Sequence, residues 1–168
     1  PWVESALHLG HVLHQSGKME KDIITKRAKF IDESVHAREG FEFASPVEVL
    51  KAVKLYVGSH YGSMLWDFGS DMASQYFHAW NTYVKLTWQV PRATHTYFLE
   101  QLLSCGHSSV RTDILARYTR YVSGLRTSPS MEVAVMFAVA HGDLRTVTGR
   151  NVALLRQETG LDPVSSSS

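Results

Sequence analysis

The sequence predicts a mainly α-helical fold, a bundle of about six or seven helices with a short β-strand or hairpin at its N-terminal edge. Apolar residues recur at three- and four-residue steps along most of the chain, which places them on one face of a helix. Serine, threonine or proline stands where several of these segments begin, and glycine stands where several of them end. The linkers between the segments are short, as is typical of a helical bundle.

The predicted β element covers residues 2–13, where Gly10 interrupts an apolar run. A helix over residues 19–39 follows. Its apolar face is predicted to contain Met19, Ile23, Phe30 and Ile31. The next helix begins at the capping box Ser45-Pro46-Val47-Glu48, in which the serine and glutamate side chains satisfy free backbone amides, and it ends near Val57.

The most regular pattern lies between Tyr61 and Trp88, and the rest of the chain is organised around it. An aromatic segment over residues 61–67 opens it, and a helix continues it. The predicted apolar face of this helix is Ala73, Tyr76, Phe77, Trp80, Tyr83 and Val84. Because a buried aromatic side chain removes roughly 150–250 Å² from water, we expect this face to anchor the core.

Four more helices are predicted after Pro91. They cover residues 93–104, a segment capped by Ser108 or Ser109 that runs to Leu125, an apolar segment from Pro129 to Gly142, and a terminal segment that Thr148 caps and Gly160 ends.

Composition and charge limit the class of protein. The 44% of hydrophobic and 20% of charged residues are typical of a globular domain, and no apolar run reaches the length of a membrane span. One cysteine, Cys105, excludes a disulfide within the chain and a multi-cysteine zinc site. The net charge is +1, but residues 18–29 hold five basic and two acidic side chains. Pro1 at the start and four serines at the end indicate a piece of a longer protein.

No residue pattern identifies a catalytic or metal site. His8, His11 and His14 recur at three-residue steps, and His107 follows Cys105 by two residues. Neither spacing assembles a set of metal ligands or a nucleophile with its base. No catalytic-triad motif, glycine-rich phosphate loop or paired-carboxylate motif occurs. We therefore predict no catalytic residues, no metal ligands and no cofactor in this chain.

Four short segments resemble the signatures of one protein family. They are His8-Leu9-Gly10, Tyr61-Gly62-Ser63-Met64-Leu65-Trp66, Ala79-Trp80-Asn81, and Asp143 followed by Thr148-Gly149-Arg150-Asn151-Val152. In this order they resemble the C-terminal region of non-LTR (LINE-type) retrotransposon reverse transcriptases, over essentially the whole chain. His8 stands where the family usually has tyrosine.

The resemblance implies a place within a larger enzyme. Residues 1–17 would be the end of the palm with its primer-grip-like strand, residues 18–91 a thumb-like helical region, and residues 92–164 a C-terminal helical region before the serine tail 165–168. No adjacent Asp-Asp occurs, so the family's polymerase signature is missing. The fragment is therefore not expected to polymerise DNA alone, and the carboxylates that bind Mg²⁺ would belong to the palm of the same polyprotein.

The expected function is to hold an RNA template/DNA primer duplex through its phosphates, without reading bases. The expected contacts are Lys18, Lys21, Lys26 and Lys29, with His8 and Gly10 near the primer end and Arg117 and Arg120 on a second surface. The resemblance also implies an intracellular location, in nucleus and cytoplasm, and no membrane partner. The alternative is a helical protein-interaction module of retroelement origin whose basic side chains are merely solvated. A metal-dependent enzyme is a third possibility.

Overall fold

In the computed structural model, the described residues are 4–8, 11–14, 19–41, 43–56, 60, 62–95, 97–99 and 109–160. Several predicted features lie outside these ranges: Gly10, Lys18, Tyr61, Cys105 and His107, most of the helix predicted over residues 93–104, and the serine tail. For residues 5–8 and 11–14 the description covers the backbone, so the position of His8 is known but not the contacts of its ring.

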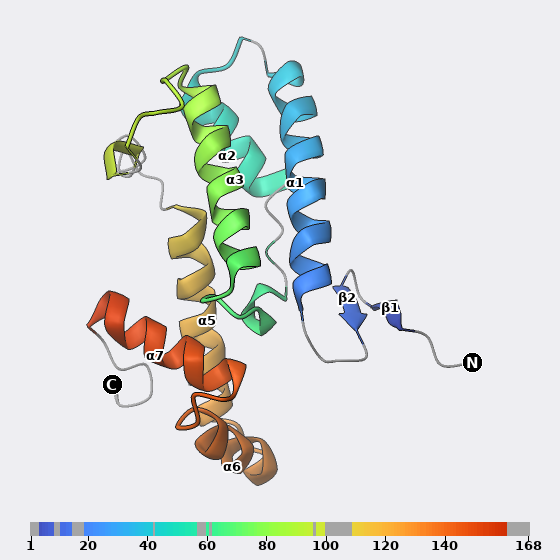
Figure 1. The fold of residues 1–168 in the computed structure, drawn as a ribbon, viewed down its shortest axis with the longest axis vertical. Helices are drawn as coiled ribbons and strands as arrows, with labels where there is room; N and C mark the ends of the chain where they lie inside the picture. The colour runs from blue at the N-terminus through green and yellow to red at the C-terminus, as the bar shows by residue number, and fades with distance from the viewer. Residues whose placement is uncertain are drawn as a thin grey trace.

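The protein is mainly helical, as the sequence predicts (Figure 1). The described elements are β1 (Ser5–His8), β2 (His11–His14), α1 (Glu20–Gly40), α2 (Pro46–Tyr56), the 3₁₀ turn η1 (Ser63–Leu65), α3 (Asp71–Thr87), α5 (Val110–Arg126), α6 (Met131–Ala140) and α7 (Val147–Thr159). The two strands pair in antiparallel register, with Ser5 opposite His14 and His8 opposite His11.

Side-chain caps start most of the helices. The capping box at α2 is confirmed: Ser45 donates its amide to Glu48 Oε2 over 2.9 Å, and Glu48 returns its own amide to the Ser45 hydroxyl. Ser70, Ser109 and Ser130 each accept an amide from the third residue of the helix that follows. These hydrogen bonds satisfy donors that a helix N-terminus leaves free.

The helices form two connected groups, α1 to α3 and α5 to α7 (Figure 1). Helices α1 and α3 run side by side, and α2 contacts both of them. Helix α5 contacts α3 and η1, and α6 and α7 lie together at its lower end. The predicted aromatic face of α3 is confirmed, since all six of its side chains are buried. Phe30 of α1 packs onto it, with its ring centroid 5.9 Å from that of Tyr76 and 5.7 Å from that of Trp80.

The predicted apolar face of α1 is correct in part. Ile23 and Phe30 are buried, but Ile31 is 44% exposed, so its assignment to the core face is wrong. The buried stripe runs instead through Asp22, Ile23, Phe30 and Ser34. Residues four apart share a helical face, so Phe30 and Ser34 stack along the line that meets α3, and Ile31 is rotated away from it.

The core is continuous between the regions before and after Pro91. Asn151 of α7 is fully buried and hydrogen-bonds to the backbone around Trp66. Its Nδ2 donates to the Trp66 carbonyl over 2.7 Å, and its Oδ1 accepts the Phe68 amide over 2.9 Å. Beside it, the Arg150 guanidinium pairs with Asp67 at 2.6 Å. The bond between Asn151 and Trp66, which are 85 residues apart, therefore joins two of the four segments that carry the family resemblance.

The predicted N-cap of α7, Thr148, is wrong. Thr146, not Thr148, is the N-cap: its hydroxyl accepts the Gly149 amide over 2.9 Å and lies 2.7 Å from the Ala140 carbonyl, to which it donates. Thr148 lies two residues later and is the second residue of the helix. A side chain on Gly149 would meet backbone, since a Cβ there would lie 2.1 Å from the Asp143 carbonyl oxygen. The glycine thus permits the close approach of α7 to the turn that precedes it.

Candidate nucleic-acid interface

Helix α1 presents two of the predicted lysines to solvent. The Lys29 side chain is 70% exposed and lies 3.4 Å from Glu33, one turn along the helix. Lys21 is also exposed and lies 3.1 Å from Glu4, in the segment before β1. Eight residues of helix separate the two lysines, a rise of about 12 Å. Exposed pairs of this kind contribute about 0–1 kcal/mol, so a phosphate can compete for either ammonium.

Lys26 has a different environment. Its side chain is 16% exposed, and its ammonium lies 3.6 Å from Asp22 and 5.8 Å from the centre of the Trp66 ring. The indole N–H of Trp66 donates to the same Asp22 carboxylate over 2.9 Å. Burial lowers the pKa of Lys26, and the charge of Asp22 opposes that shift. The Lys26 ammonium is therefore part of a buried polar cluster with Asp22 and Trp66.

The histidine just before η1 is buried. His60 is 4% exposed, and its Nδ1 is 3.2 Å from the Tyr76 hydroxyl. Burial lowers the pKa of His60 to about 4, and the positive charges of Arg117, Lys26 and Lys54 add to that shift. Lys54 itself pairs with Asp113 at 2.8 Å. A neutral imidazole at physiological pH follows from this environment.

The three cations that lower the pKa of His60 come from three helices: Lys26 from α1, Lys54 from α2 and Arg117 from α5. The sequence places Arg117 on a second surface, separate from the lysines of α1. In the structure Arg117 adds to the lowered pKa of His60, and its place on a second surface stays a prediction. Arg117 and Arg120 are exposed on α5, and neither guanidinium forms an ion pair within the described part of the chain.

Sequence reasoning missed three residues that shape this region: Asp22, Lys54 and His60. One feature of the sequence indicates that Asp22 is buried: it is an acid beside Ile23 on the apolar face of α1. The partner that satisfies it, Trp66, lies 44 residues away, and the pattern of α1 alone does not reveal it. Lys54 is the second lysine of α2, and its pattern there is that of a solvated side chain. Its contact with Asp113, 59 residues away, is not visible in that pattern.

Among the described side chains, no group of three or more His, Cys, Asp or Glu residues is placed to hold a metal ion. No helix in the described ranges combines the length and apolar character that a bilayer crossing needs. Comparison with protein-family models, curated proteins and solved structures gives no match.

Proposed function

We propose that this chain is the thumb and C-terminal region of a non-LTR retrotransposon reverse transcriptase, and that it holds the RNA template/DNA primer duplex by backbone contacts. The sequence resemblance motivates the proposal. The observation that supports it is the pair of exposed lysines, Lys21 and Lys29, on the outside of a helix that the aromatic core holds in place. The rest of the polyprotein would supply the palm, the fingers and the Mg²⁺-dependent chemistry, inside the cell.

The physical argument concerns competition for the ammonium groups. A duplex carries closely spaced phosphates and a condensed layer of counterions, and neutralising a phosphate releases counterions. The acids that pair with Lys21 and Lys29 are themselves exposed, so exchanging them for phosphates costs little. Arg117 and Arg120 add two guanidinium groups on α5 that need not give up an ion pair with any described residue. Lys26 is set apart from this group, because its ammonium is held by Asp22.

The experiment is a titration of a labelled RNA–DNA hybrid, followed by fluorescence anisotropy across a salt series. Affinity should fall linearly on a log–log plot, with little dependence on sequence, and by about 0.9 units of slope per phosphate contacted. The variant Lys21→Glu/Lys29→Glu should bind more weakly with a slope smaller by about two. Lys51→Glu, an exposed lysine on α2, is the matched control. Equal loss of affinity in the control, or an affinity that does not change with salt, would refute the backbone-contact proposal.

One observation favours the alternative, a protein-interaction module. Helix α6 exposes a set of large apolar side chains: Met131, Val135, Met136 and Val139. Clusters of this kind on a protein surface often mark interfaces with other proteins. If the folded chain binds no hybrid at low salt, this function takes first place, and its binding to a partner should persist as salt is raised.

A further inference from the structure

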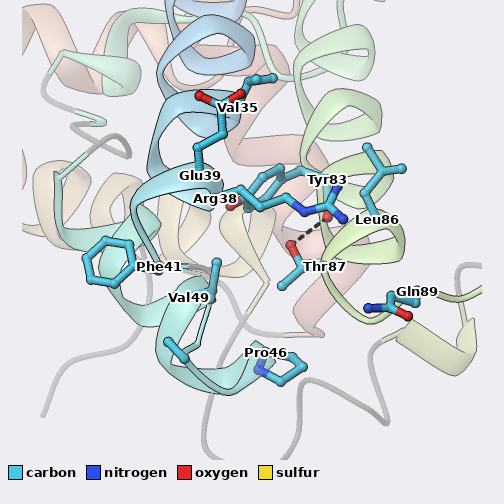
Figure 2. Close-up of a pocket in the computed structure, with 11 residues that line it drawn as sticks. Val35, Arg38, Glu39, Phe41, Pro46, Val49, Tyr83, Leu86, Thr87 and Gln89 are labelled. Carbon is cyan, nitrogen blue, oxygen red and sulfur yellow. Dashed lines mark hydrogen bonds between the residues drawn. The ribbon is translucent and has the colours of Figure 1, made fainter.

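A groove opens at the end of the helical group formed by α1, α2 and α3. It encloses about 670 Å³ and lies where α1 ends, α2 begins and α3 ends (Figure 2). Its apolar lining includes Phe41, Ala44, Pro46, Val49 and Leu86. Sites for small ligands have volumes of about 300–1,000 Å³ and combine apolar walls with a few polar groups. The groove therefore has the size and the walls of such a site.

The polar groups in the groove are mostly hydrogen-bond donors. Arg38 reaches from α1 toward α3, with its guanidinium on the side of Leu86 and Thr87 (Figure 2). No acid in the described ranges pairs with this guanidinium. Gln89 also lines the groove, and it is the one described non-glycine residue with a positive φ, at 53°. The Thr87 hydroxyl already donates to the Tyr83 carbonyl over 3.0 Å.

Tyr83 supplies the unusual feature of the groove. The residue is 6% exposed, and its hydroxyl is buried without a hydrogen-bond partner within the described residues. Burial raises the pKa of this hydroxyl, while the neighbouring Thr87 hydroxyl and the charge of Arg38 offset part of the shift. A buried hydroxyl left unpaired is unfavourable, and a hydrogen bond to a ligand oxygen would remove that penalty. The Arg38 guanidinium and the Tyr83 hydroxyl are thus two hydrogen-bond donors without an acceptor among the described residues.

We propose that this groove binds a small monocarboxylate with an apolar body. The carboxylate would accept hydrogen bonds from the Arg38 guanidinium and the Tyr83 hydroxyl, and the body would pack on Phe41, Pro46 and Val49. A single negative charge fits better than two, because Glu39 also lines the groove and offsets part of the positive charge of Arg38. This site is independent of the proposed nucleic-acid contacts, which use Lys21 and Lys29.

The test uses the full chain, with biphenyl-4-carboxylate as the probe and biphenyl-4-carboxamide as its uncharged match. Binding is measured by titration calorimetry and located by amide shifts in ¹⁵N NMR spectra. The carboxylate should bind saturably and the carboxamide about tenfold or more weakly, because charge-assisted hydrogen bonds are lost. Shifts should centre on Arg38, Tyr83 and Gln89. Absence of saturable binding, equal affinity for both probes, or shifts centred on α6 would overturn the proposal.

Two variants link the binding to the named side chains. Arg38→Gln should weaken the carboxylate about tenfold and bring its affinity close to that of the carboxamide. Tyr83→Phe should weaken it several-fold without lowering the melting temperature, since the hydroxyl that it removes has no partner. Arg120→Gln, an exposed arginine on α5, is the matched control and should bind as the wild type does. Unchanged binding in both Arg38→Gln and Tyr83→Phe would contradict the assignment.

Discussion

Replacing Asn151 tests whether α7 is joined to the central core by the hydrogen bonds described above. In Asn151→Leu a side chain of similar size remains, but the Phe68 amide and the Trp66 carbonyl both lose their partner. Both groups are buried next to a side chain with no exposed surface. Each unsatisfied buried group costs about 1–3 kcal/mol, so the free energy of unfolding should fall by about 2–6 kcal/mol. A loss of about 3 kcal/mol lowers the melting temperature by about 6–12 °C in a chain of this length.

The assay is urea unfolding of the full chain, followed by tryptophan fluorescence and by circular dichroism. The two probes should give one coincident transition in the wild type, because Trp66 and α7 belong to the same core. Gln157→Ala, an exposed change on the same helix, should alter the free energy of unfolding by less than about 0.5 kcal/mol. If Asn151→Leu loses less than about 1 kcal/mol, the junction between α7 and Trp66 does not stabilise the fold in the way argued here.

Three further predictions follow from single contacts. The folded pKa of His60, about 4, lies below its unfolded value of about 6.5, so the unfolded state binds a proton that the folded state does not. The free energy of unfolding should therefore fall by about 3 kcal/mol as the pH drops from 6.5 to 4. When unfolding is measured at each pH, this pH-dependent loss should be absent in His60→Gln. Gly149→Ala should destabilise the fold by several kcal/mol in urea titrations, because the new Cβ meets a backbone carbonyl at 2.1 Å, and unchanged stability would mean that the turn moves freely. Lys26→Met should lower the melting temperature clearly, since a buried carboxylate loses its counter-charge, whereas Lys29→Met should leave it within about 2 °C; equal effects would contradict the buried cluster.

The sequence predicted the features that depend on local pattern. The core face of α3 could be predicted because six apolar side chains follow the helical period without interruption. The capping box at Ser45 could be predicted because both partners lie within four residues. At α7 two threonines stand two residues apart, and the pattern did not distinguish them. Thr146 is the cap because the Ala140 carbonyl, six residues before it, accepts from its hydroxyl.

The sequence could not predict features that depend on contacts between distant segments. An acid within a helix is normally expected to face solvent, and Asp22 is buried because an indole N–H from residue 66 and an ammonium from the next turn satisfy it. The predicted lysines therefore differ in burial, which their spacing does not show: the Lys26 side chain is largely buried and the Lys29 side chain is exposed. Likewise Lys54 of α2 pairs with Asp113 of α5, 59 residues away, and nothing in either helix alone indicates this contact.

The residues that carry the family resemblance and the residues proposed to bind nucleic acid belong to different parts of the structure. Trp66, Trp80 and Asn151 are buried and hold helices together, whereas Lys21 and Lys29 lie at the surface and contribute little to stability. These core residues can therefore stabilise the fold whether or not the surface binds a duplex. Stability and binding should respond to separate substitutions: Asn151→Leu should lower stability but keep hybrid affinity where the chain is folded, and Lys21→Glu/Lys29→Glu should do the reverse. A lysine variant that loses stability in step with affinity would show that the two roles are not separate.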